Sequence, residues 1–139
     1  DDTDTELALK IIFQLYPEAE VTIFGAFGGR IDHMLSNIFL VSDPELAPFM
    51  RRICLRDKQN KITYYPEGSH KVLPEPGMTY VSFLQEGNGE LTILGAKYEL
   101  TSKNYFQKKI YSSNEFIDGP IYVTVPNGYV IVIQTKDRS

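Results

Sequence analysis

The spacing of apolar residues changes near residue 50, and this change most constrains the fold. Before it, apolar residues of segments 3–16 and 30–41 recur at helical spacing, which predicts two helices. Between them, the β-branched run 20–25 predicts a short buried strand that ends at a glycine. Helix, strand and helix in this order are typical of an α/β layer, in which helices connect parallel strands.

Short strand-like segments follow the change. They occupy residues 52–57, 61–67, 70–75, 78–86, 90–95, 96–102, 105–111, 120–126 and 129–136. The glycines of segment 87–89 predict a hairpin before 90–95, and Asn127–Gly128 predicts a final hairpin. About eight short strands with regular turns are typical of an antiparallel sandwich or barrel. We therefore expect an α+β chain: a partial α/β segment over residues 1–50, then an antiparallel β-sandwich or barrel over 51–139.

Composition narrows the class of protein. The 139 residues are 42% hydrophobic and 23% charged, as in ordinary globular domains. The net charge of −4 argues against non-specific nucleic-acid binding, for which a basic face is expected, and leaves a local basic patch possible. No apolar run approaches the roughly 18 residues of a membrane span. The single cysteine, Cys54, is predicted to be buried in a strand and cannot form an internal disulfide, so a cytoplasmic location is the simplest expectation.

A glycine-rich stretch joins the predicted strand 20–25 to the second predicted helix. Glycines let the backbone approach a ligand closely, and a helix N-terminus offers free N–H groups to an anion. Arg30 adds a forked donor that suits phosphate, and Asp32 is a candidate Mg²⁺ ligand. The stretch matches neither of the two common glycine-rich nucleotide motifs. Chemistry alone leaves two interpretations open, an anion site or a tight turn followed by an ordinary acidic helix start.

The chain begins with the acidic sequence DDTD at residues 1–4. Three carboxylates in four residues can hold a complex of metal and phosphate. Acidic residues and threonine are also what a helix N-terminus favours, and Thr3 with Glu6 fits a capping box. Taken alone, this segment favours the capping interpretation.

Two further segments combine an aromatic ring with neutral polar groups. Tyr98 lies in segment 95–102, and Ser112, Ser113 and Asn114 lie close together further along the chain. A flat ring beside hydrogen-bonding groups suits a polar heterocyclic ligand. The alternative is an ordinary loop beside a tyrosine carried on a strand.

Together, these segments resemble thiamine pyrophosphokinase. That family shows D-x-T-D, then G-x-x-G-G-R-x-D-H with a following asparagine, then G-L-K-Y/W-x-L and a T/S-S-N segment. Their order and spacing agree with this sequence across nearly the whole chain. Ala96 stands where the family usually has leucine.

The resemblance implies an enzyme that transfers pyrophosphate from ATP to thiamine, giving thiamine diphosphate and AMP with the help of Mg²⁺. Residues 1–50 would be the remnant of a nucleotide-binding α/β domain, and residues 51–139 a thiamine-binding β-sandwich. The family's pocket lies between the two subunits of a homodimer. Neither a nucleic acid nor a membrane is expected as a partner. The alternative is a non-catalytic β-sandwich module that binds a small ligand.

The resemblance also assigns roles to residues, although it identifies no general base. The metal ligands would be Asp1, Asp4 and Asp32, and the last two would also be catalytic. ATP phosphates would be bound by Gly28, Gly29, Arg30 and Asn37. Thiamine would be bound by Tyr98, Ser112, Ser113 and Asn114.

One departure from the family is large. The family carries a further acidic motif, G-D-x-D-S, ahead of D-x-T-D, and this motif supplies additional metal ligands. The present sequence does not contain it. We therefore expect the chain to be the C-terminal portion of such an enzyme, and the sequence does not predict whether this portion is active alone.

Overall fold

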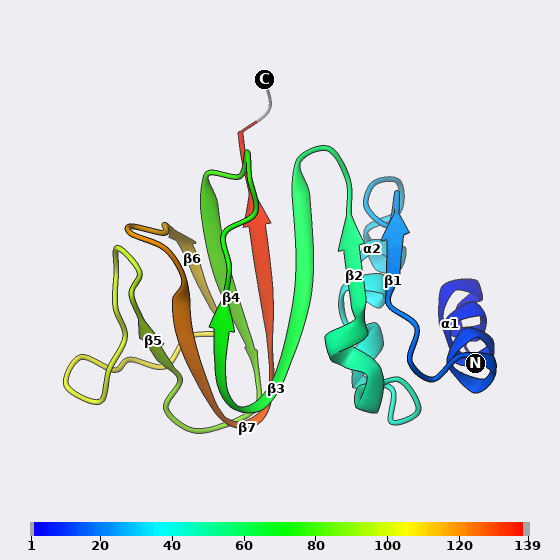
Figure 1. The fold of residues 1–139 in the computed structure, drawn as a ribbon, viewed down its shortest axis with the longest axis horizontal. Coiled ribbons are helices and arrows are strands. Elements are labelled where there is room, and N and C mark those ends of the chain that lie inside the picture. Colours follow the sequence, from blue (N-terminus) through cyan, green and yellow to red (C-terminus); the bar gives the residue numbers. More distant parts are fainter. Residues whose placement is uncertain (1, 138–139) are drawn as a thin grey trace.

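The structure is a computed structural model that describes residues 2–137 (Figure 1). Its first half contains α1 (Asp4–Leu15), β1 (Val21–Phe24), α2 (Ile31–Ile38) and two 3₁₀ segments, η1 (Leu40–Ser42) and η2 (Ala47–Arg52). Its strands continue with β2 (Ile53–Arg56), β3 (Asn60–Val72), β4 (Tyr80–Glu86), β5 (Thr92–Leu94), β6 (Ile110–Asn114) and β7 (Ile121–Thr135). The predicted α+β class is confirmed.

The helix α1 begins at the predicted cap. The Thr3 hydroxyl accepts a hydrogen bond from the Glu6 amide at 3.2 Å, and the Glu6 carboxylate accepts one from the Thr3 amide at 2.9 Å. Such reciprocal bonds satisfy two N–H groups that a helix start leaves unpaired. The capping box is therefore confirmed.

The helix α2 is shorter than predicted. It ends at Ile38, and the turn η1 takes over where the prediction extended the helix to residue 41. Leu40 and Val41 are both almost fully buried in this turn. Both side chains belong to the core on the helical side, so this turn is held by packing rather than by the periodicity of an α-helix.

All strands join one sheet with the order β1-β2-β3-β7-β4-β6, and β5 pairs with β7. The pair β1–β2 is parallel and the other pairings are antiparallel. In β2, Ile53 and Leu55 are buried, whereas Cys54 between them is only partly buried because alternate residues face opposite sides. Since β2 pairs with both β1 and β3, the sheet continues across residue 50, and the division into two domains stays a prediction.

The strands β3 and β7 are longer than predicted and run side by side through a common bend (Figure 1). The pairing shifts register between Pro66 and Gly68 of β3, opposite residues 126–128 of β7. The predicted break in β3 and the predicted hairpin at Asn127–Gly128 are therefore wrong. Each half of β7 pairs with β3 rather than with the other half, so the Asn-Gly pair bends one strand and does not reverse the chain.

Two other predicted features are also wrong. The strand β4 pairs with β6 and β7, so β4 and β5 do not form the predicted hairpin. Segment 96–102 contains an isolated bridge at Ala96 and another at Leu100 in place of a strand. Because β7 is long, β5 pairs with its first half and β4 with its second half, which separates the two strands.

The sheet divides the apolar side chains into two cores. Along β7, Val130 and Val132 face the core enclosed by the curled β-sheet, whereas Tyr129 and Ile131 face the helices. On the helical side, the Phe13 and Phe49 rings stack with centroids 4.4 Å apart. No helix in residues 2–137 combines the length and the apolar character that crossing a membrane requires.

The bend of β7 depends on Gly128. Its φ is +69°, and an added Cβ would collide with the Glu86 carbonyl oxygen of the neighbouring strand. We predict that Gly128→Ala lowers the free energy of unfolding by about 3 kcal/mol, from a left-handed backbone and a backbone clash together. Urea denaturation measures this change.

The matched control is Gly25→Ala, because Gly25 has a similar φ, +73°, but nothing lies within 4 Å of an added Cβ. This variant should lose only about 1 kcal/mol. Equal losses in the two variants would contradict a role for the close contact between β4 and β7.

Candidate active site

The acidic segment before α1 and the polar face of α2 border the same cavity. The cavity measures about 360 Å³ and is lined by Asp2, Thr3, Asp4, Thr5, His33 and Asn37. The structure therefore brings together two motifs that are separated in the sequence by α1 and β1. Of the lining residues, Asp4 and Asn37 were predicted site residues, whereas the predicted Gly28, Gly29, Arg30 and Asp32 do not line the cavity.

The glycine stretch forms the turn between β1 and α2. Gly25, Gly28 and Gly29 have φ values of +73°, +104° and +71°, and no atom lies within 4 Å of an added Cβ at any of them. The turn thus needs glycine for its backbone and also leaves open space around it. Asn37 donates a hydrogen bond from Nδ2 to the Ala26 carbonyl at 3.0 Å, which ties this turn to α2.

Arg30 and Asp32 form an exposed pair in front of the same helix. The Arg30 Nε and Nη2 atoms lie 3.1 and 2.5 Å from the two carboxylate oxygens, and the His33 amide donates a further bond to Asp32. The guanidinium holds the pKa of the Asp32 carboxyl below its ordinary value. Because exposed ion pairs contribute little net energy, a phosphate and a cation can each replace one partner of this pair at small cost.

The acidic cluster near α1 contains a lysine that pairs with two of its three carboxylates. Carboxylates of Asp2, Glu6 and Asp43 gather within 4.8 Å of one another. The Lys10 ammonium lies 2.7 Å from Asp2 and 2.8 Å from Asp43, and these contacts raise the pKa of Lys10. The cluster therefore has an internal counter-ion.

Asp4 is not part of that cluster and stands exposed at the cavity. Of the predicted metal ligands, Asp1 lies outside the described residues. The proposed set of Asp1, Asp4 and Asp32 therefore stays a prediction.

A second cavity, of about 550 Å³, lies beside β5 and β6. Three of the four residues predicted for thiamine line it, namely Tyr98, Ser112 and Asn114. The fourth, Ser113, does not line it. Ser113 adopts a left-handed backbone with φ of 60°, and its amide donates to the Ser82 hydroxyl at 3.1 Å.

Asn114 holds the backbone of Tyr98 in place. Its Oδ1 accepts a hydrogen bond from the Tyr98 amide at 2.9 Å, and its Nδ2 donates to the Tyr98 carbonyl at 2.8 Å. The Asn114 side chain is 4% exposed, whereas the Tyr98 ring is 61% exposed. The buried amide thus positions the tyrosine, whose exposed ring has the Lys97 ammonium 5.5 Å from its centre.

Several residues that line this cavity were missed in the sequence. They are Ile93, Glu99, Leu100, Asn104, Phe106, Lys108 and Tyr111. The Tyr111 hydroxyl donates to the Phe106 carbonyl at 2.7 Å and accepts from the Lys108 amide, and burial raises the pKa of Tyr111 to about 12. These bonds fold segment 101–109 against β6. Residues 105–109 were predicted as part of a strand, but β6 begins only at Ile110. The available signal for this side of the cavity was the aromatic content next to Ser112.

The two cavities lie at opposite ends of the molecule (Figure 1). The helices α1 and α2 are at one end of the long axis, and β5 and β6 are at the other. The sheet lies between them. One copy of the chain therefore cannot close both cavities around one ligand.

Comparisons with known proteins agree with this geometry. The family model described as the thiamin pyrophosphokinase catalytic domain matches residues 1–53, and the model of its vitamin B1 binding domain matches residues 69–130. The first model contains the cavity at α1 and α2. The second contains Tyr98, Ser112 and Asn114 of the other cavity. The chain belongs to the thiamine pyrophosphokinase family.

Individual members of the family are similar over nearly the whole chain. Thiamine pyrophosphokinase of Bacillus subtilis is 34% identical over 140 residues, covering 99% of this chain and 64% of the relative. A family member from Enterococcus faecalis has a crystal structure that is 43% identical with a TM-score of 0.91, covering 99% of this chain and 65% of that one. The chain thus spans just under two thirds of the length of these family members.

We predict that Asn114→Ala loosens Tyr98. Losing the side chain leaves the Tyr98 amide and carbonyl without their partners, so the free energy of unfolding should fall by about 2 kcal/mol. Hydrogen exchange of the Tyr98 amide should become faster than in the unchanged protein.

The control is Ser112→Ala, an exposed neighbour in the same cavity, which should change stability by less than about 0.5 kcal/mol. Unchanged exchange at Tyr98 in Asn114→Ala would rule out the positioning role.

Proposed function

We propose that the protein is a thiamine pyrophosphokinase, which transfers the pyrophosphoryl group of ATP to the hydroxyethyl oxygen of thiamine and releases AMP. One observation carries this proposal. The residues matched by the catalytic-domain model and those matched by the B1-binding model each border a cavity of their own. A cytoplasmic location fits an ATP-dependent reaction and a chain with one cysteine.

The cavity at α1 and α2 would hold the phosphates. The open turn at Gly28 and Gly29 offers backbone N–H groups ahead of a helix N-terminus, where an anion is favoured. Arg30 adds a forked donor, and Asn37 keeps the turn against α2. Transfer of a phosphoryl group depends mainly on positioning and on neutralising charge, so these groups need no covalent step.

Carboxylates beside this cavity suit a divalent cation. Asp4 lines the cavity, and Asp32 is exposed in the first turn of α2 next to the lining residue His33. Both would present hard oxygen ligands, which Mg²⁺ prefers, and Asp1 would complete the set within this chain. Mg²⁺, when bound, neutralises phosphate charge. The Arg30–Asp32 pair would then separate, with the guanidinium on phosphate and the carboxylate on the metal.

The cavity at β5 and β6 would hold thiamine. The exposed Tyr98 ring, fixed by Asn114, offers a flat surface to a pyrimidine ring. Ser112 lines the same cavity and offers a neutral hydrogen-bonding group. Ser113 would act through the backbone of β6, because its amide is bonded to Ser82.

We further propose that a homodimer completes the site. ATP and thiamine must meet for the transfer, but their cavities lie at opposite ends of one chain (Figure 1). In a dimer, the phosphate cavity of one copy faces the thiamine cavity of the other. The alternative, a β-sandwich module that only binds a small ligand, would be stabilised by that ligand without producing AMP.

We predict that the full protein releases AMP from ATP only when thiamine and Mg²⁺ are both present. Asp32→Asn should lower turnover at least tenfold with the fold intact, because a metal ligand is lost. Tyr98→Ala should weaken thiamine binding more than ATP binding. AMP release that does not require thiamine would contradict the proposal.

Mixed dimers test whether the site is shared between copies. Co-expressing Asp32→Asn with Tyr98→Ala places both changes in one site of a mixed dimer and leaves its other site intact. Random pairing should then restore about a quarter of the unchanged activity. Activity that stays at the level of the separate variants would place the whole site within one copy.

A further inference from the structure

A basic groove lies on the face of the sheet opposite α1 and α2. It measures about 350 Å³, and its cationic lining residues are Arg51, Arg52, Arg56, Lys61 and Lys71. Cys54 and Arg56 point to this face because their neighbours Ile53 and Leu55 face the helical core. Thr22 and Thr63 also line it. Val21, Ile53, Tyr65 and Leu73 line it as well, so the groove combines apolar walls with a majority of polar and charged groups.

The bend in β3 creates the groove. Lys61 lies near the start of β3 and Lys71 near its end, and both line the same hollow. Residues ten positions apart on a straight strand would lie about 33 Å apart. The curled strand thus brings together two lysines that are ten positions apart in the sequence.

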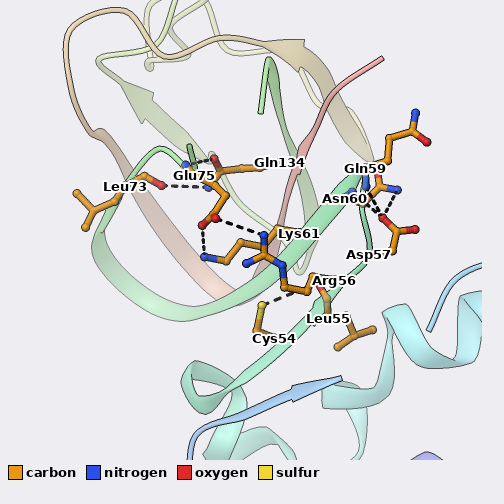
Figure 2. Close-up of polar contacts among 10 residues, drawn as sticks. All are labelled: Cys54, Leu55, Arg56, Asp57, Gln59, Asn60, Lys61, Leu73, Glu75 and Gln134. Carbon is orange, nitrogen blue, oxygen red and sulfur yellow. Dashed lines mark hydrogen bonds and ion pairs between the residues drawn. The ribbon is translucent and has the colours of Figure 1, made fainter. Parts of the chain in front are cut away.

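The fold already places one carboxylate against this groove. Glu75 lies 2.7 Å from the Lys61 ammonium and 3.3 Å from the Arg56 guanidinium (Figure 2). These two cations hold the pKa of the Glu75 carboxyl below its ordinary value. The geometry of Arg56 and Lys61 is therefore suited to an anionic oxygen.

A buried glutamine fixes the position of Glu75. Gln134 is 4% exposed, and its side chain accepts from the Glu75 amide at 2.7 Å and donates to the Leu73 carbonyl at 3.0 Å (Figure 2). The connection after β3 is thereby held against β7. The backbone of Glu75 is therefore fixed by Gln134, and its carboxylate is placed by Arg56 and Lys61.

Positive charge remains after this pairing. The Arg51 guanidinium lies 3.8 Å from the centre of the Tyr65 ring and donates from Nη1 to the Tyr64 carbonyl. Among residues 2–137, neither Arg51 nor Lys71 takes part in an ion pair. The lining includes one acidic residue, Glu20, against five cationic ones, and Glu18 pairs with Arg52. With Glu75 included, the groove carries a surplus of positive charge.

We propose that the basic groove binds a small phosphorylated anion, at a site separate from the two cavities described above. A guanidinium held flat on an aromatic ring keeps donors free for phosphate oxygens, and Lys71 adds a point charge. The volume suits a compact polyphosphate rather than a chain of nucleotides. The proposal does not depend on the catalytic activity proposed for the protein.

The alkylation rate of Cys54 can be used to detect an anion bound in this groove. Cys54 lines the groove, is partly buried and is the single cysteine of the sequence. The experiment measures the rate of Cys54 alkylation by iodoacetamide with increasing inorganic pyrophosphate, against potassium chloride of equal ionic strength. Pyrophosphate should slow alkylation about threefold at twice its dissociation constant, since bound protein reacts only after release.

Three variants test the role of charge in this protection: one should weaken it, one should strengthen it, and the third is a control. Lys71→Gln should weaken pyrophosphate protection several-fold, because it removes a cation from the groove. Glu75→Gln should strengthen it several-fold, because the resident carboxylate no longer competes for Arg56 and Lys61. Lys103→Gln is the matched control: Lys103 is likewise exposed and forms no ion pair among the described residues, but it does not line the groove. It should leave protection unchanged.

Other outcomes would overturn the proposal. Equal slowing by potassium chloride would assign the effect to ionic strength, and equal protection in Lys71→Gln and the unchanged protein would exclude the groove. Absence of any slowing by pyrophosphate would also exclude it. Pyrophosphate bound only in the cavity at α1 and α2 would not protect Cys54, which distinguishes this site from the proposed catalytic one. Arg51→Lys, which keeps the charge but loses the fork, gives a second test that should weaken protection.

Discussion

The pairing of β3 with β7 is the constraint on which the rest of the structure depends. β7 also carries β4 and β5, so it links every strand of the β-rich part. Its alternating side chains supply both cores, with Val130 and Val132 on one side and Tyr129 and Ile131 on the other. A change in the bend would therefore alter the core on the helical side and the core next to β5 and β6 together.

This arrangement explains why the two candidate cavities are far apart. The helices pack on one side of the β3–β7 pair, whereas β5 and β6 lie beyond it (Figure 1). Interactions that prepare each cavity are local: Asn37 ties the glycine turn to α2, and Asn114 ties Tyr98 to β6. Both asparagines act on backbone and leave other groups to meet a ligand. Each cavity is thus pre-organised by its own local contacts, and the proposed dimer would bring the two kinds of cavity together.

The sequence predicted correctly those features that depend on residues adjacent in the chain. The capping box at Thr3 and Glu6, and the glycine turn before α2, depend on a few adjacent positions, so their patterns were sufficient. Asn127–Gly128 was predicted as a hairpin because its local preference is a turn. A distant strand, β3, runs alongside and makes that turn a bend. Likewise, the sequence presented Asn114 as a ligand contact, since the partner that occupies its amide, the Tyr98 backbone, lies 16 residues away.

The basic groove follows from the same long-range bend. In the sequence, its lysines and arginines are scattered, and the net charge of −4 leaves a local basic patch possible without placing it. Net charge describes the whole chain, whereas binding depends on the local field, which falls off within about 10 Å in salt. Because β3 curls, Lys71 returns to the hollow that contains Arg56 and Lys61, and Gln134 sets Glu75 beside them. An acidic protein can therefore hold a positively charged hollow wherever a bent strand gathers cations from distant positions.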